Sequence, residues 1–377
     1  MNYGAVVDGL AASGNLRVLP PDASLLPDVV DLSSNDYLGI AGDVELRTSF
    51  FAEAALNGLA MTSSASRLLA GNQNEYYLLE DMLGRLYGGC ALLFNSGYHA
   101  NVGLMSSLAD KRTLVVADRL VHASIIDGIM LSKADFVRFR HNDYGHLRQI
   151  MGKKARDYGS VIIVAESVYS MDGDRADIDA LVSVKRDYPD TLLYIDEAHA
   201  LGVEGPGGLG LVAASMSRDY VDVIVGTFGK ALASSGAFCV TRKDIKNFLV
   251  NHARSLIFST ALPPVTVAWT RKVFGRVLGM DSARMQLKKL SHALNGILSS
   301  YGNSGAVVSH IQPLIIGDPV KTVSLSQRLF DKGYKVLPIR RPTVSPGTER
   351  LRFSLSASIS MEQVDLLGNV MKDCYAI

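Results

Sequence analysis

The chain has 377 residues, of which 48% are hydrophobic and 20% charged, so it is long enough for one large domain and a smaller one. Lysine and arginine number 38 against 37 for aspartate and glutamate, a balance that gives no long-range attraction to nucleic acid or anionic lipid. The three cysteines lie far apart without a CxxC spacing, which predicts neither a disulfide framework nor a metal site.

The N-terminal sequence MNYGAVVDGL lacks a basic start and a continuous apolar core. No later stretch has the roughly 20 uninterrupted apolar residues of a membrane span. We therefore expect a soluble, cytoplasmic protein with neither a membrane nor a nucleic-acid partner. Residues 1–45 form a lead-in segment that ends at SSNDYLG, whose Asn-Asp and Gly predict a turn.

Short apolar runs then alternate with longer segments of helical periodicity. The runs are ALLFNSG (91–97), TLVVAD (113–118), SVIIVAES (160–167), TLLYID (191–196) and DVIVGT (222–227). Runs this short and apolar on both faces are typical of parallel strands covered by helices, so the class is α/β. Ligands of such sheets bind beyond the carboxyl ends of the strands. Those ends carry polar residues here: Asn95-Ser96-Gly97-Tyr98, Asp118, Glu166, Asp196 and Thr227.

After ALPP (261–264) the pattern changes to a long helical stretch through about residue 300. There follow the strand-like GAVVSHIQPLIIGD, the helix-like KTVSLSQRLFDKG, the strand-like YKVLPI, the strand LRFSLSA and a helix from Met361. We therefore predict a large domain over residues 46–267 and a smaller α+β domain over residues 268–377.

Two segments resemble nucleotide motifs without their context. IDEAH (195–199) matches the DEAH box of helicases, but in the nearest phosphate-loop candidate, GTFGKA, Ile224 replaces the first Gly and Ala231 the magnesium-binding hydroxyl. GPGGLG (205–210) satisfies GxGxxG, yet it follows a loop, and Asp222 opens the next strand instead of closing it. The second segment is better explained as a glycine-rich turn.

Lys230 lies just after a predicted strand, in GTFGKALASSGAF (226–238). A single lysine is most often a solvated surface charge. Small neighbours, however, let a flat ligand approach closely, and a desolvated lysine becomes an amine nucleophile. If that amine forms a Schiff base with an aldehyde cofactor, an acid must keep the cofactor's pyridine nitrogen protonated, and Asp196 is the candidate acid.

The same hypothesis assigns the neighbouring strand ends. His199, on the strand exit that carries Asp196, can hydrogen-bond the ring oxygen of the cofactor. Thr227 and the backbone amides of Gly97 and Tyr98 can hold a phosphate at the start of a helix.

Taken together, the motifs resemble the α-oxoamine synthase family of pyridoxal phosphate enzymes, which have the aspartate aminotransferase-like fold (fold type I). The matching segments, in order, are SSNDYLG, SASRLLAG, FNSGYHAN, ADRLVHASIIDG, RFRHND, SVYSMDGD, IDEAHALGVEGPGGLG, GTFGKALASSGAF, FSTALPP and IRRPTVSPGTERLRFSLSA. The resemblance runs nearly end to end. It implies a large domain with a mostly parallel sheet and a smaller α+β C-terminal domain.

By this resemblance Lys230 binds the cofactor and later serves as acid and base at the substrate carbon, and His122 stacks on the cofactor ring. Ser170 would lie near the ring oxygen, although a serine there is also a common turn cap. Arg352, assisted by Asn35, would bind the amino-acid carboxylate through its planar guanidinium. As an isolated residue, His122 would more often be structural.

The resemblance also implies a homodimer whose active site lies at the subunit interface. Thr260, with Ser259, would reach the phosphate of the cofactor in the neighbouring subunit. Arg17 and Thr343 match positions that contact the substrate in biotin-pathway members of the family. Relatives usually have a histidine where this chain reads NEYYLLE, near Tyr76, which leaves the thioester-side contacts open.

The implied reaction is a decarboxylating condensation of a small amino acid with an acyl thioester. The short lead-in and IRRPTVSPGTERLR favour L-alanine and a pimeloyl thioester, in biotin synthesis, with coenzyme A or a carrier protein as the acyl carrier. The alternatives are glycine C-acetyltransferase, serine palmitoyltransferase and a catalytically silent partner subunit. The joint presence of Lys230, Asp196 and His199 argues against the last.

Overall fold

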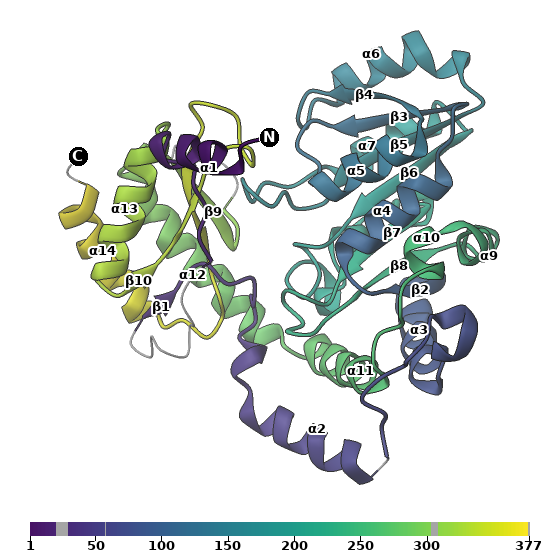
Figure 1. Cartoon of the computed structure of the whole chain (residues 1–377), viewed down its shortest axis with the longest axis horizontal. Coiled ribbons are helices and arrows are strands. Elements are labelled where there is room, and N and C mark those ends of the chain that lie inside the picture. The colour runs from purple at the N-terminus through teal and green to yellow at the C-terminus, as the bar shows by residue number, and fades with distance from the viewer. Residues whose placement is uncertain (20–28, 57, 303–307, 376–377) are drawn as a thin grey trace. The chain divides into compact units, whose positions relative to one another are not determined.

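The computed structural model describes residues 1–19, 29–56, 58–302 and 308–375 (Figure 1). Unit 1 comprises Met1–Leu38, Ser170–Asp174 and Ser282–Ile377, and unit 2 comprises Gly39–Tyr169 and Arg175–Asp281. The predicted lead-in and the predicted strand GAVVSHIQPLIIGD fall partly outside the described residues, at 20–28 and 305–307. None of the described helices is both long and apolar enough to cross a membrane.

Unit 2 is built on a seven-stranded sheet in which β8 runs antiparallel to both its neighbours and all other neighbours are parallel. The strand order is β2-β8-β7-β6-β5-β3-β4. The strands are β2 (Cys90–Phe94), β3 (Thr113–Asp118), β4 (Asp135–Phe139), β5 (Ser160–Glu166), β6 (Thr191–Asp196), β7 (Val223–Thr227) and β8 (Ala237–Thr241). All five predicted runs contain strands, so the predicted α/β class with a mostly parallel sheet is confirmed.

Most helices of unit 2 flank this sheet, whereas α2 lies away from it (Figure 1). Several begin at side chains that accept a hydrogen bond from the first turn; for example, Ser96 caps α4, Asp143 caps α6 and Asp177 caps α7. The helices are α2 (Val44–Leu56), α3 (Asn74–Tyr87), α4 (Gly97–Leu108), α5 (Ala123–Ser132), α6 (Tyr144–Lys154), α7 (Ile178–Arg186), α8 (Leu211–Ala214), α9 (Lys243–His252), α10 (Arg254–Ile257) and α11 (Pro264–Leu278).

One face of the sheet packs against α4, α5 and α9. Its buried cluster includes Val115, Ile162, Val164, Tyr194, Val223, Val225 and Cys239 from the strands, with Leu104, Met105, Ile125, Ile129 and Leu249 from the helices. Strand side chains alternate between faces, so Glu166, Asp196 and Thr227, two residues after Val164, Tyr194 and Val225, share this face. The carboxyl ends of three neighbouring strands therefore carry polar groups on the face of the sheet covered by α4 and α5.

Strands β4 and β8 were absent from the predicted runs. The edge strand β4 contains Arg138 and is only partly buried, so it lacks the continuous apolar pattern of an interior strand. Only residues 228–236 separate β7 from β8. A parallel crossover needs a dozen or more residues, so this short connection forces the antiparallel direction of β8.

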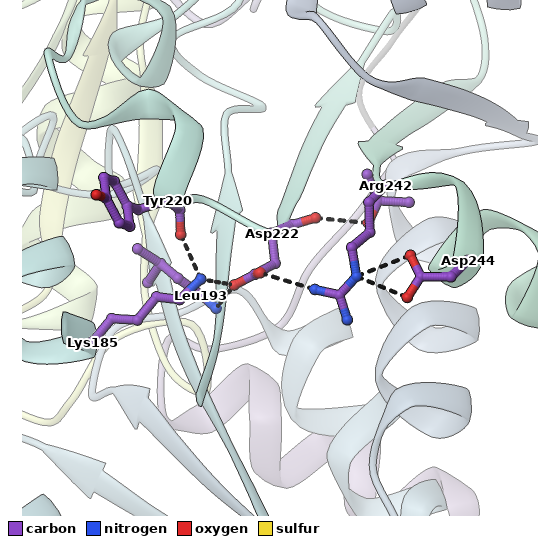
Figure 2. A network of polar contacts seen from close by, with 7 residues as sticks. Lys185, Leu193, Tyr220, Asp222, Arg242 and Asp244 are labelled. Atoms are coloured by element: carbon purple, nitrogen blue, oxygen red, sulfur yellow. Dashed lines mark hydrogen bonds and ion pairs between the residues drawn. The ribbon is translucent and has the colours of Figure 1, made fainter. Parts of the chain in front are cut away.

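Asp222 anchors the opposite end of β7, where a network of polar contacts joins three elements (Figure 2). Its carboxylate ion-pairs with Lys185 of α7 and accepts the backbone N–H of Leu193 of β6 at 2.6 Å. Arg242, at the end of β8, reaches its other oxygen at 3.3 Å. Because these partners hold the carboxylate, Asp222 has a structural role in this sheet.

Unit 1 has the α+β composition predicted for the C-terminal part of the chain. Strands β11, β12 and β9 form an antiparallel sheet, and β1 pairs in parallel with β10. The strands are β1 (Val30–Asp31), β9 (Ile311–Ile315), β10 (Tyr334–Lys335), β11 (Leu337–Ile339) and β12 (Arg350–Ser354). The helices are α1 (Tyr3–Ala12), α12 (Asp281–Ser299, whose first residue belongs to unit 2), α13 (Pro319–Asp331) and α14 (Met361–Tyr375).

The segment GPGGLG forms the predicted glycine-rich turn, which is fastened to Glu197. At Gly210, φ is +97°, and a Cβ there would lie 2.4 Å from Oε2 of Glu197, so the chain approaches this carboxyl as only glycine allows. The two Glu197 oxygens accept the backbone N–H groups of Leu211 and Val212 at 3.1 and 2.6 Å, and Ser167 Oγ at 2.7 Å. The buried Glu197 carboxyl therefore fixes the position of the turn that follows β6.

Burial raises the pKa of Glu197 from its ordinary 4.5 to about 7, although these three hydrogen bonds oppose the shift. Between these two values the folded chain keeps a proton at Glu197 that the unfolded chain releases. The stability contribution of this carboxyl is therefore greatest at low pH and falls as pH rises through this window.

We expect the substitution Glu197→Gln to remove this dependence. From pH 5 to pH 8 the free energy of unfolding of the wild type should fall relative to the variant by on the order of 3 kcal/mol, measured by urea unfolding. Glu53→Gln, at an exposed carboxylate, should show the wild-type pH dependence. A wild-type curve parallel to that of Glu197→Gln would contradict the raised pKa.

Candidate active site

Asp196 ends β6 with its carboxylate buried, at 4% exposure. Its Oδ2 accepts Nδ2 of Asn101 on α4 at 2.8 Å, and its Oδ1 accepts the backbone N–H of Ala198 at 2.9 Å. A carboxylate withdrawn from water needs such donors to offset the lost hydration. The structure thus confines an acid at the carboxyl end of the sheet.

Lys230 lies in the turn between β7 and β8, and its Nζ is 2.9 Å from Nε2 of the buried His199. His199 belongs to the turn that follows β6, three residues after Asp196. Because β6 and β7 are parallel neighbours, both turns lie at the same edge of the sheet. The predicted lysine, acid and histidine are therefore gathered at two adjacent strand ends.

The N-terminus of α4 adjoins the end of β7. A Cβ built on Gly97 would lie 3.6 Å from Oγ1 of Thr227, so the first turn of the helix and this hydroxyl are neighbours. The amides of Gly97 and Tyr98 belong to that first turn, where helix N–H groups have no acceptor within the helix and favour anions. Predicted phosphate-binding groups from separate segments thus lie together.

His122 caps α5, and its Nδ1 lies 2.7 Å from Oγ of Ser124 and 3.2 Å from the Ser124 backbone nitrogen. Burial lowers the pKa of the imidazole, and the charge of Lys230 lowers it further against the opposing effects of Asp196 and Asp127. The imidazole is therefore a flat, neutral ring at neutral pH.

Glu166 ends β5 directly opposite Asp196 of β6 in the strand register. It is 2% exposed, and its Oε1 has no hydrogen-bond partner among the described residues. Burial, and then the charge of Asp196, raise the pKa of Glu166 well above its usual value, which keeps this carboxyl protonated. The sequence placed Glu166 at a strand end but gave it no role.

Asn101 and Tyr194 are functional candidates that the sequence interpretation missed. Asn101 lies on α4 at 2% exposure, donates to Asp196, and accepts the hydroxyl of Tyr194. An asparagine within a helix is a weak helix former whose side chain usually binds elsewhere, which is the one signal available in GYHAN. Asp196 and Tyr194, its partners on β6, lie more than ninety residues away along the chain.

Unit 1 brings together three other predicted residues. Arg352 of β12 is 3% exposed and donates Nε to the carbonyl of Ser170 at 2.6 Å. Its two terminal nitrogens donate to Oδ1 of Asn35 at 3.2 and 3.3 Å. The predicted carboxylate-binding guanidinium is therefore oriented by neutral oxygens.

Arg17 and Thr343 are also adjacent within unit 1. Nη2 of Arg17 donates to Oγ1 of Thr343 at 2.8 Å. Burial, followed by the nearby charge of Arg17, lowers the pKa of the Arg340 guanidinium. Two neighbouring cations of this kind favour an anionic ligand.

Ser259 and Thr260 follow α10 in unit 2. Thr260 is exposed, pairs with Ser66 in a short antiparallel bridge, and accepts Nδ2 of Asn95 at its carbonyl at 2.7 Å. Contact of these hydroxyls with a cofactor of a neighbouring subunit remains a prediction.

The donor set in unit 2 fits pyridoxal phosphate. An amine at Lys230 suits its aldehyde, the buried acid Asp196 suits a protonated pyridine nitrogen, and the helix start at Gly97 with the Thr227 hydroxyl suits its phosphate. These groups come from the ends of β6 and β7 and from α4, so one sheet edge carries all three functions.

Known proteins resemble this chain along most of its length. The sequence profile of the aminotransferase class I and II family matches residues 27–369. A Pasteurella multocida protein, provisionally named 8-amino-7-oxononanoate synthase, is 50% identical over 339 residues, or 89% of this chain and 88% of the relative.

Two solved structures are also similar. Serine palmitoyltransferase from Sphingomonas wittichii has a TM-score of 0.86 at 31% identity, covering 92% of this chain and 87% of that one. A structure described as SPT with an internal PLP aldimine has a TM-score of 0.85 at 29% identity, covering 93% and 89%.

Proposed function

Because this chain belongs to the aminotransferase class I and II family, we propose that it condenses L-alanine with a pimeloyl thioester to give 8-amino-7-oxononanoate, carbon dioxide and the free thiol. It is an α-oxoamine synthase, a pyridoxal phosphate-dependent acyltransferase. The observation that carries the choice of substrates is the 50% identity to a relative named for this reaction. The proposed product belongs to biotin synthesis.

Pyridoxal phosphate supplies an electron sink for negative charge at the substrate Cα. Lys230 would hold the cofactor through its amine, and once the substrate amine has displaced it, the freed amine would take the proton from Cα so that this carbon can attack the thioester carbonyl. Asp196 would hold a proton on the pyridine nitrogen, and its Asn101 and Ala198 donors keep the carboxylate in place. His199, beside Lys230, is assigned to the ring oxygen.

The remaining residues of unit 2 bind and cover the cofactor. We assign the phosphate to Thr227 and the amides of Gly97 and Tyr98, and the ring face to His122. The neutrality of the buried His122 imidazole supports stacking, because a flat uncharged ring can pack against a heterocycle without a desolvation cost for a charge.

In unit 1 we assign the amino-acid carboxylate to Arg352, with Ser170 and Asn35 as the groups that orient it. The guanidinium presents a planar set of donors, and fixing it against neutral oxygens reduces the entropy lost on binding. Arg17 and Thr343 are assigned to the acyl substrate. The charges of Arg17 and Arg340 suit the free carboxylate of a pimeloyl chain, which acetyl and palmitoyl chains lack.

The proposal includes a homodimer in which Ser259 and Thr260 reach the cofactor of the other subunit. Large apolar side chains near this segment are exposed in the single chain: Phe258 is 70% exposed and Leu69 is 82% exposed. The bridge between Ser66 and Thr260 links their two segments. Neighbouring exposed apolar side chains favour burial against another protein surface.

The substrate assignment predicts a preference for L-alanine with pimeloyl-CoA. We expect its kcat/KM to exceed that for glycine with the same thioester by about 10- to 200-fold, the range for one methyl group in a pocket. Lys230→Ala should be folded and inactive with every pair, which controls for background condensation. Strong preference for glycine with acetyl-CoA, or for serine with palmitoyl-CoA, would replace the proposed substrates.

Arg352→Lys should raise KM for L-alanine by about 10- to 100-fold, because lysine cannot bind a carboxylate through two parallel hydrogen bonds. The KM for pimeloyl-CoA should change much less. Arg350→Lys is the matched control on the same strand, since Arg350 ion-pairs with Asp172. Equal effects of the two substitutions on the alanine KM would speak against the role of Arg352.

Mixing two inactive variants tests the shared site. Lys230→Ala and the double variant Ser259→Ala/Thr260→Val should each lose activity. Reassociated heterodimers would have one intact site each, so the mixture should recover about a quarter of wild-type turnover. No recovery, with heterodimers detected by native mass spectrometry, would place all these residues in one subunit's own site.

A further inference from the structure

We propose that Asn101 and Ser124 form a directional hydrogen-bond relay from Asp196 to His122, which fixes the imidazole as the neutral tautomer with its proton on Nε2. The relay consists of these four residues, from β6, α4 and the start of α5. It rests on the pyridoxal phosphate site and is independent of the identity of the acyl substrate.

The orientation of the Asn101 amide is fixed from both sides. An ionised carboxylate can only accept hydrogen bonds, so the atom 2.8 Å from Oδ2 of Asp196 must be the amide nitrogen. On the other side, the hydroxyl of Tyr194 donates to Oδ1 of Asn101. Burial and the charge of Asp196 raise the pKa of Tyr194 well above its usual value, so this phenol keeps the proton that it donates.

The second hydrogen of the Asn101 amide points to Ser124. Nδ2 of Asn101 lies 2.9 Å from Oγ of Ser124, and this oxygen therefore accepts. Ser124 is fully buried, and its hydroxyl has one proton of its own. That proton is available for Nδ1 of His122, which lies 2.7 Å from the same oxygen.

Nδ1 of His122 thus faces two donors. The Ser124 hydroxyl approaches it, and the backbone N–H of Ser124 donates to it at 3.2 Å. A ring nitrogen that accepts hydrogen bonds carries no proton, so a neutral imidazole must carry its proton on Nε2. Nε2 is then a hydrogen-bond donor.

The charges that face the imidazole come from several elements. Asp196 of β6 and Asp127 of α5 favour a cationic ring, while Lys230 after β7 and burial oppose it more strongly, so the pKa of His122 is lowered. Glu166 of β5 accepts a hydrogen bond from the His122 backbone, and its own raised pKa keeps it uncharged.

The relay explains why two polar side chains, Asn101 of α4 and Ser124 of α5, are buried beside the sheet. Asp196, assigned to the pyridine nitrogen, and the His122 imidazole, assigned to the ring face, are linked through the two side chains Asn101 and Ser124. Asn101 and Ser124 are positioning residues: they act through Asp196 and His122. Asp196 sets the direction of these hydrogen bonds because its carboxylate only accepts. A group that could also donate would allow the Asn101 side-chain amide to flip and exchange its oxygen and nitrogen.

The tautomer can be measured directly by NMR on the holoenzyme labelled with ¹⁵N-histidine, with the His122 signals identified by their loss in His122→Gln. We expect Nε2 of His122 to be protonated and Nδ1 unprotonated in the wild type. Protonation at Nδ1 in the wild type would overturn the relay, whatever the substrate of the enzyme proves to be.

Ser124→Ala removes the donating hydroxyl and should shift the tautomer ratio toward Nδ1–H by about 5-fold, the effect of losing one hydrogen bond. Ser107→Ala is the matched control, because the Ser107 hydroxyl donates only to the Gly103 carbonyl within α4. A ratio in Ser124→Ala equal to that in the wild type would show that Ser124 does not set the tautomer.

Asn101→Ala tests the other end of the relay, because Asp196 loses its donor at Oδ2. The dissociation constant for pyridoxal phosphate should rise by about 10-fold, measured by fluorescence titration of the apoprotein, as expected for a hydrogen bond to a charged group. Unchanged affinity in a folded variant would remove Asn101 from the relay.

Discussion

Asp196 is a buried carboxylate, and the arrangement around it follows from the need to supply it with donors. Water is largely excluded at 4% exposure, so the cost of burying the charge is offset by Asn101 and the Ala198 amide. Asn101 can serve only because alternation along β6 points Asp196 and Tyr194 toward α4. The burial of Asp196 therefore depends both on the sheet face that it occupies and on the helix α4 that covers this face.

The same constraint organises the rest of the sheet edge. Glu166 lies opposite Asp196 in the register, and burial together with the charge of Asp196 raises the pKa of Glu166, which keeps it protonated. The short turn after β7 returns the chain at once through the antiparallel β8, which keeps Lys230 beside His199 at the strand ends. Charge, register and turn length thus place a lysine and an acid on neighbouring strands.

In unit 1, by contrast, the predicted substrate-binding residues are organised by neutral partners. Arg352 is held by the Ser170 carbonyl and the Asn35 side chain, and Arg17 by the Thr343 hydroxyl. A guanidinium that is oriented without a carboxylate keeps its charge available for a ligand. Arg350, on the same strand as Arg352, differs in this respect. It forms an ion pair with Asp172 within the protein, so its charge is already neutralised.

The sequence alone determined the class of the fold, five of the strands in the larger sheet, and the motifs around Lys230, Asp196 and His199. It could do so because short apolar runs and the turn residues that follow them are local properties of the chain. The glycine-rich turn at 205–210 was predicted on the same basis, but its attachment to Glu197 was not.

The tertiary structure decided which of these residues meet. Strand β8 escaped prediction although the few residues after β7 already excluded a parallel crossover, and the partially exposed β4 has too little apolar periodicity to be recognised. Asn101 and Tyr194 cannot be assigned a role from local sequence, since Asn101 binds Asp196 and Tyr194, both more than ninety residues away. Ser124 lies two residues from His122, but only the packing of α4 brings Asn101 to its hydroxyl. Their role exists only where α4 and α5 pack on the face that carries Asp196, because a hydrogen bond depends on position in space and local sequence does not encode that position.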